Sequence, residues 1–137
     1  MICVDASVLV RVLTNTASPK TVAAWNQWRA HPGQMVAPAL MHFELSNALH
    51  QYTRAGTFQA DAVDRMVALA LRLPNEIVDG DDLHRDALSA ARRYNIASVY
   101  DAHDLALAER LGIEFVTADK ELRKRVSAAA PWVRLME

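Results

Sequence analysis

The sequence predicts a three-layer α/β/α domain with a central parallel sheet of about five short strands. Short apolar runs alternate with segments of helical periodicity along the whole chain, a pattern typical of a parallel sheet with helices on both faces. The apolar runs are continuous rather than alternating, as expected when both faces of the sheet are covered. At 137 residues, the chain has the length of one domain, so we expect a single domain over residues 1–137.

Five short apolar segments are predicted as strands of this sheet, and a sixth as an added edge strand. Each is bounded by a turn former or by the start of a helical pattern, as in the segment that Pro38 closes. The six segments are Met1–Val4, Met35–Ala37, Glu76–Val78, Ala97–Val99, Glu114–Thr117 and Trp132–Leu135.

Seven segments with helical spacing are predicted as helices between the strands. Ser18 and Pro19 suit an N-cap and a first helical position, and Trp25 and Trp28 give the helix that follows an apolar stripe for packing. Gly112 is a predicted helix stop. The helices are Ala6–Leu13, one beginning at Pro19, Ala39–Arg54, Ala60–Leu73 with its stop at Pro74, Leu83–Tyr94, Ala102–Leu111 and Lys120–Ala128.

Composition limits the functional class. The net charge of −1 and the pI near 6.5 exclude a strong overall attraction to nucleic acid, which is typical of domains with a pI above about 9. A nucleic-acid substrate would therefore depend on local basic patches and metal ions. The single cysteine, Cys3, excludes an intramolecular disulfide and favours a cytoplasmic location. We expect no signal peptide, and no membrane span because no apolar run approaches about 18 residues.

Acidic residues stand where the predicted strands end. Asp5 directly follows the first strand, and Asp101 and Asp119 follow the strands predicted at 97–99 and 114–117. Glu44 lies a turn or two into the helix after the second strand. Because ligands of open parallel sheets bind at the carboxyl ends of the strands, we expect all four acids to face one crevice.

A cluster of this kind needs a cation. Carboxylates held close together repel one another unless they are protonated or neutralised. Hard divalent cations prefer oxygen ligands, and no cysteine or histidine joins the set, so the donor type indicates Mg²⁺ or Mn²⁺ rather than zinc.

Four segments carry a resemblance to a known family. Residues 4–9 (VDASVL), 43–49 (FELSNAL), 98–112 (SVYDAHDLALAERLG) and 115–122 (FVTADKEL) together resemble the PIN-domain ribonucleases, and most closely the VapC-type toxins of bacterial toxin–antitoxin pairs. The segments lie in the family's order and span essentially the whole chain. The family's four acids correspond to Asp5, Glu44, Asp101 and Asp119, the same four that the strand-end argument selects.

The resemblance implies an activity and partners. It implies a metal-dependent endoribonuclease that hydrolyses RNA phosphodiesters with metal-activated water, a homodimer, and a cognate antitoxin protein that blocks the active-site groove. On this basis we expect Asp5, Asp101 and Asp119 to bind the metal directly. Glu44 is expected to act through a bound water or to orient the nucleophile.

Four further residues are candidates for supporting roles. Ser7 matches a family hydroxyl after the first acid and could bind an outer-shell water, and Thr117 matches the hydroxyl residue before the last acid. Asn47 follows Glu44 by three residues and could hydrogen-bond it. Asp104 departs from the aromatic or small residue of many relatives, which leaves open a further metal ligand, a supporting group or a solvated charge.

Structural and functional alternatives remain beside this interpretation. Asp5, Asp101 and Asp119 could each cap the following helix, and Glu44 could lie on a solvated helix face. The basic residues of the last helix, 120 and 123–125, could guide phosphates or form a solvated face. A catalytically weak PIN-like RNA-binding module and a non-toxin RNA-processing nuclease are the alternative functions. Haloacid-type phosphatases are disfavoured because they need a second aspartate two residues after the first, where this chain has Ser7. Receiver domains are disfavoured because they need a pair of acids at the first strand, which is absent here.

Overall fold

The computed structural model describes residues 1–73 and 75–137, so the helix stop predicted at Pro74 lies outside the described residues. Its centre is a five-stranded sheet in the order β3-β2-β1-β4-β5, in which every neighbouring pair is parallel. The predicted three-layer α/β/α class is confirmed. The strands are β1 (Ile2–Val4), β2 (Met35–Pro38), β3 (Asn75–Val78), β4 (Glu114–Thr117) and β5 (Val133–Leu135).

The strand order reverses beside β1. From β1 the chain builds outward through β2 to β3, and then returns to place β4 on the other side of β1. Val4 pairs with Val116, and the Asp5 N–H donates to the Val116 carbonyl at 2.9 Å, so β1 and β4 end side by side. Ligands of doubly wound sheets bind where the strand order reverses, at the carboxyl ends. The carboxyl ends of β1 and β4 are therefore the place to look for a site.

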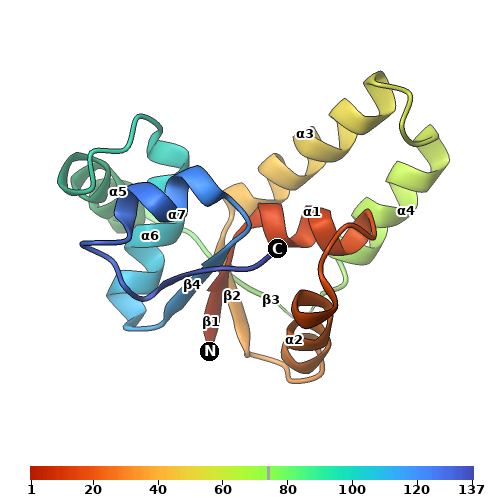
Figure 1. Ribbon diagram of the computed structural model, residues 1–137. Helices are drawn as coiled ribbons and strands as arrows, with labels where there is room; N and C mark the ends of the chain where they lie inside the picture. The colour runs from red at the N-terminus through yellow and green to blue at the C-terminus, as the bar shows by residue number, and fades with distance from the viewer. Residues whose placement is uncertain (74) are drawn as a thin grey trace.

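In the part of the chain that the structure describes, seven helices cover the two faces of the sheet (Figure 1). One face, to which Ile2 and Val4 point, packs against α1 to α4, and the other, to which Cys3 points, packs against α5 to α7. Trp25 and Trp28 lie in the first of these cores, as predicted. The helices are α1 (Ala6–Leu13), α2 (Pro19–Arg29), α3 (Leu40–Arg54), α4 (Ala60–Ala70), α5 (Asp81–Arg93), α6 (Val99–Leu111) and α7 (Lys120–Val126).

One predicted strand is wrong. Residues 97–99 form no strand; instead Ser98 is the N-cap of α6, and its hydroxyl accepts a hydrogen bond from the Tyr100 N–H at 3.3 Å. A short apolar run does not distinguish a buried strand from the start of a buried helix. Here the segment starts a helix because α6 is buried over residues 102–108 and packs against β1, β2 and β4. Asp101 therefore lies in the first turn of a helix and not at a strand end.

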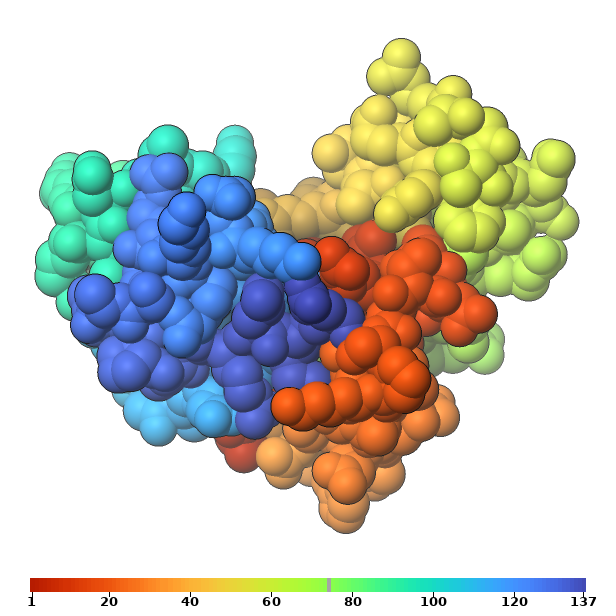
Figure 2. Space-filling model, viewed as in Figure 1, coloured from red at the N-terminus to blue at the C-terminus, as the bar shows by residue number. Residues whose placement is uncertain are grey.

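The two helical layers leave a hollow above the sheet. Figures 1 and 2 show the α3–α4 pair projecting from the molecule on one side, with α5, α6 and α7 on the other and α1 between them.

The predicted helix boundaries differ from those of the structure by three residues at most, as where α4 ends at Ala70. Of the helices in the described residues, none has both the length and the apolar character needed to cross a membrane.

Candidate active site

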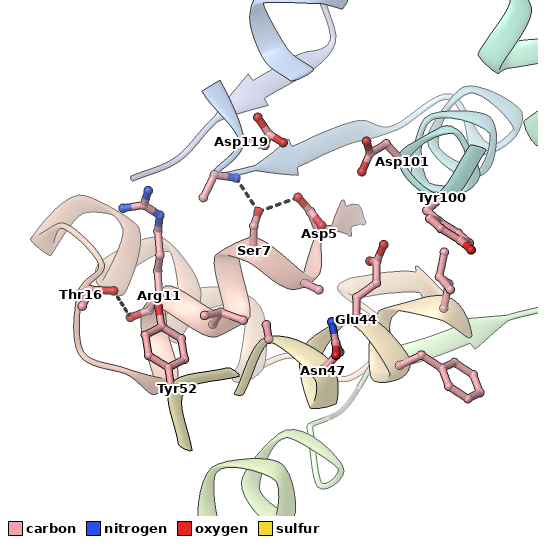
Figure 3. A pocket seen from close by; sticks show the side chains of 16 residues that line it. Asp5, Ser7, Arg11, Thr16, Glu44, Asn47, Tyr52, Tyr100, Asp101 and Asp119 are labelled. Atoms are coloured by element: carbon pink, nitrogen blue, oxygen red, sulfur yellow. Dashed lines mark hydrogen bonds between the residues drawn. The ribbon is translucent and has the colours of Figure 1, made fainter. Parts of the chain in front are cut away.

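A cavity of about 1060 Å³ opens at the carboxyl ends of β1 and β4. Its lining includes the four acids selected from the sequence: Asp5 from the end of β1, Asp119 from the β4–α7 junction, Glu44 from α3 and Asp101 from α6. In Figure 3, Glu44 rises from α3 toward the side chains of Asp5 and Asp101, with Asp119 across the cavity. The structure thus brings all four predicted acids to one place, although Asp101 reaches it from a helix start.

Asp5 is held by two hydroxyl groups. The Ser7 hydroxyl donates to Asp5 Oδ2 at 2.5 Å, and the Thr117 hydroxyl donates to the same oxygen at 2.6 Å. Each hydroxyl in turn accepts from a backbone N–H after β4, Ser7 from Ala118 at 2.9 Å and Thr117 from Asp119 at 3.0 Å. These four bonds fix the orientation of the carboxylate. Ser7 and Thr117 therefore support Asp5 directly.

The three aspartates that could be helix caps differ in the structure. Asp5 occupies the N-cap position of α1, but its side chain makes no capping hydrogen bond within the described residues. Asp101 follows the actual N-cap, Ser98. Asp119 does cap a helix: its Oδ1 accepts from the Glu121 and Leu122 N–H groups at 2.8 and 3.0 Å. Asp119 is thus a cap whose carboxylate also lines the cavity.

The carboxylates raise one another's pKa. Burial, followed by the charges of Asp5 and Asp101, raises the pKa of Glu44 to about 7. Burial, then the charges of Asp5 and Asp119, raises the pKa of Asp101 to about 6. Burial also raises the pKa of Asp5, although the hydrogen bonds from Ser7 and Thr117 oppose the rise. Protein cations are not among the causes of these shifts, so the negative charge of the cluster is left for another group to neutralise.

Asp104 is the main residue whose place the sequence left open. It is only 3% exposed, which excludes a solvated surface charge. Carboxylate oxygens of Asp5, Glu44 and Asp104 all lie within 4.8 Å of one another. The pKa of Asp104 is raised well above its usual range by burial and then by the charges of Asp5, Glu44 and Asp101. The available sequence signal was its position three residues after Asp101 on one helix face.

The remaining predictions have different outcomes. Asn47 lines the cavity, and its Oδ1 accepts a hydrogen bond from Gln51 Nε2 at 3.5 Å. The expected hydrogen bond between Asn47 and Glu44 does not form in the part of the chain that the structure describes. Lys120 pairs with Glu137 and Arg125 Nη1 donates to the Asn95 carbonyl, outside the cavity lining. The basic residue that does line the cavity is Arg11, which is not among the residues selected from the sequence.

The donor set fits a hard divalent cation. Every close acidic group presents carboxylate oxygen, the ligand type that Mg²⁺ and Mn²⁺ prefer. Asp5, Glu44 and Asp104 supply three such groups at distances that one ion could span, and Asp101 and Asp119 line the same cavity. A cation here would also offset the carboxylate charges that, after burial, raise the pKa of Glu44 and Asp101.

The family comparison matches nearly the whole chain. The PIN domain profile matches residues 2–127, and the chain therefore belongs to the PIN-domain family. No curated protein is significantly similar to the sequence. Family membership confirms the PIN resemblance and supports a place among the PIN nucleases.

Solved structures share the fold at low sequence identity. PAE2754 from Pyrobaculum aerophilum has a TM-score of 0.70 and 24% identity, over 90% of this chain and 83% of that one. A toxin–antitoxin complex from Klebsiella pneumoniae has a TM-score of 0.69 and 18% identity, over 98% and 96% of the two chains. VapC20 of Mycobacterium tuberculosis, described as a Sarcin-Ricin loop cleaving toxin, has a TM-score of 0.67 and 20% identity, over 100% of each chain. These likenesses show a fold shared with VapC toxins.

Proposed function

We propose that this chain is a metal-dependent endoribonuclease and the toxin of a type II toxin–antitoxin module. The observation that carries the proposal is the convergence of Asp5, Glu44, Asp101, Asp104 and Asp119 on the strand-order reversal of a PIN fold. Three of these carboxylates have oxygens within 4.8 Å of one another. Such a cluster is costly to the fold without a cation, and so favours a functional role.

The acids divide the work in this proposal. Asp5, Asp101 and Asp119 hold Mg²⁺ or Mn²⁺, and Asp104 is a further candidate ligand from beneath. When bound, the cation supplies Lewis-acid polarisation of a phosphoryl oxygen and a more acidic water. Glu44 orients the attacking water and takes its proton, a role supported by its position in the cavity lining beside Asp5 and Asp101. Ser7 and Thr117 keep Asp5 in its orientation.

An RNA substrate is supported by the cavity's aromatic rim. Phe43 and Tyr100 both line the cavity and are 71% and 60% exposed. Exposed aromatic rings stack on unpaired bases, and RNA is recognised mainly through loops and unstacked bases. A structured RNA with an exposed loop therefore suits this surface better than a duplex.

The proposal includes protein partners and a location. Shared folds with a toxin–antitoxin complex and a VapC toxin support a cognate antitoxin, and the family resemblance supports a homodimer in the cytoplasm. The homodimer is tested by light scattering of the purified protein at tens of micromolar, where a monomer would contradict it.

The decisive experiment is cleavage of a mixed cellular RNA pool by purified, antitoxin-free protein. Wild type and Asp5→Asn are compared with Mg²⁺, Mn²⁺ or EDTA. Cleavage that needs metal and disappears in the variant supports the nuclease and its site. Folded wild-type protein that cleaves nothing with either metal would favour an RNA-binding module, and equal cleavage by both proteins would place the activity outside this site.

A further inference from the structure

The acid-lined cavity has a second end of different character. Figure 3 shows Arg11 and Tyr52 lying away from Asp101, on the other side of Ser7 and Asn47. Arg11 is the only basic residue in the described lining of this cavity. The cavity therefore has a negative end and a positive end.

Arg11 is not used by the rest of the protein. Its guanidinium makes no hydrogen bond and no ion pair with the residues that the structure describes, whereas Arg93 and Arg110 each bind a carboxylate, Glu109 and Asp86. Arg11 also does not neutralise the acid cluster, because only burial and other carboxylates shift the pKa of Glu44. A half-buried, unpaired cation in a cavity wall is available for an anionic ligand.

Helix geometry separates Arg11 from the acids by a useful distance. Ser7, which bonds Asp5, and Arg11 are four residues apart in α1 and so lie on one helix face. Arg11 lies six positions after Asp5, which corresponds to about 9 Å along the helix axis. A stacked nucleic-acid strand rises about 3.4 Å per nucleotide, so this separation is roughly two to three nucleotide steps.

We propose that Arg11 forms a binding site for a second phosphate of the RNA, displaced along the strand from the phosphodiester that is cut. The inference rests on the proposed nuclease function and gives it a strand-positioning residue. Arginine suits the role because its planar guanidinium binds phosphate through two parallel hydrogen bonds. A fixed second phosphate would hold the strand in one register across the acids.

A competing carboxylate near Arg11 is already occupied. The pKa of Glu137 is lowered first by Lys120, which forms an ion pair with it, and only lastly by the charge of Arg11. Glu137 is anchored separately, since its carbonyl accepts from the Ser18 N–H at 2.8 Å and from the Thr21 hydroxyl at 2.5 Å. Lys120 therefore holds this carboxylate and leaves the guanidinium of Arg11 for a ligand.

The test compares RNA binding and cleavage by Arg11 variants. Binding of a short, randomised, fluorescent single-stranded RNA is measured in the Asp5→Asn background over a range of salt concentrations, with Arg11→Gln, Arg11→Lys and the control Arg29→Gln. Arg29→Gln removes the same charge, but Arg29 lies on α2 and lines a separate cavity. We expect Arg11→Gln to weaken binding about tenfold and to lower the salt slope by about 0.7, with Arg11→Lys intermediate and Arg29→Gln unchanged. In otherwise wild-type protein, Arg11→Gln should raise KM more than it lowers kcat.

The outcomes separate the two proposals. If Arg11→Gln binds with the affinity and salt slope of its parent while wild type still cleaves RNA, the second phosphate site is overturned and the nuclease stands. Equal losses in Arg11→Gln and Arg29→Gln would also overturn it, because the effect would then be one of overall charge. If the Asp5→Asn parent does not bind RNA and the wild type does not cleave it, both proposals fail. Arg11→Lys is the control for misfolding, because it keeps the charge and most of the aliphatic part of the side chain.

Discussion

The hydroxyl of Thr117 donates a hydrogen bond to Asp5 Oδ2 at 2.6 Å, across 112 residues of sequence. The same hydroxyl oxygen accepts from the Asp119 N–H at 3.0 Å. One fully buried side chain thus couples the carboxylate that ends β1 to the backbone that leads into α7. Groups that orient metal-binding carboxylates in this way control how well the ion is held.

Removing this hydroxyl should weaken the site without removing an acid. Thr117→Val keeps the shape of the side chain, but it leaves the Asp119 N–H without a partner and leaves Asp5 Oδ2 with the Ser7 hydroxyl as its one remaining hydroxyl donor. We expect a loss of about 10- to 100-fold in Mn²⁺ affinity or cleavage rate, and a decrease of about 1–3 kcal/mol in the free energy of unfolding. Calorimetric Mn²⁺ titration and denaturant unfolding measure the two effects. Thr117→Ser, which keeps the hydroxyl, is the control, and equal metal affinity in Thr117→Val would contradict the role.

Replacing the first acid should separate function from stability. In Asp5→Asn the amide oxygen can still accept from Ser7 and Thr117, while one negative charge beside Glu44 is removed. We therefore expect cleavage to be abolished and the metal-free protein to be as stable as wild type or more stable. Thermal unfolding in EDTA and the RNA cleavage assay test this pair of outcomes. A clear loss of stability in the metal-free state would instead identify Asp5 as a structural residue.

The stability of the metal-free protein should fall as the pH rises. The pKa of Glu44 is raised from 4.5 to about 7 and that of Asp101 from 3.8 to about 6, so both carboxyls bind protons more tightly in the folded state. Their stabilising contribution is complete below the unfolded pKa values and is lost as the pH rises through the folded ones. We expect the free energy of unfolding in EDTA to decrease between about pH 4.5 and pH 7.

The pH effect has a specific control. Glu44→Gln should flatten the upper part of this dependence, because it removes the group whose pKa is about 7. Saturating Mg²⁺ should oppose it, since the ion binds the deprotonated acids. Denaturant unfolding at several pH values measures all three series. A wild-type stability that rises steadily over this range in EDTA would show that the acids are not strained in the absence of metal.

The sheet was predictable because its strands carry strong local signals. Buried apolar runs end at Asp5 and shortly before Asp119, so the two acids at the strand-order reversal could be located from the sequence. The strand expected at 97–99 could not be excluded locally, because Ser98 and Val99 fit either a strand or a helix start. What decides between them is the packing of α6 against the sheet, which is a tertiary effect.

For the same reason, the burial of Asp104 and the place of Arg11 in the cavity could not be predicted from the sequence. α6 is buried on several sides, so it lacks the polar face that would have shown Asp104 to be an inward-pointing acid. Nothing in the sequence marked Arg11 as a cavity residue, because its place there depends on α1 lying beside α3. A residue type and its spacing predicted the four acids, but only the fold shows which other charges share their cavity.

Asp104 offers the sharpest test of how the metal is held. Its carboxylate is buried and lies within 4.8 Å of carboxylate oxygens of Asp5 and Glu44, and the side-chain donor beside it is the weak Cys3 thiol, 3.9 Å from Oδ1. If Asp104 is a ligand, Asp104→Asn should lower Mn²⁺ affinity at least about tenfold, because a charged oxygen donor is lost. It should also stabilise the metal-free protein, because the neutral amide relieves the repulsion. Calorimetric Mn²⁺ titration and thermal unfolding in EDTA measure both, with Asp82→Asn as a control on the exposed surface of α5. Unchanged Mn²⁺ affinity in Asp104→Asn would mean that Asp104 is a buried core residue that does not bind the ion, and that the other four acids make the site.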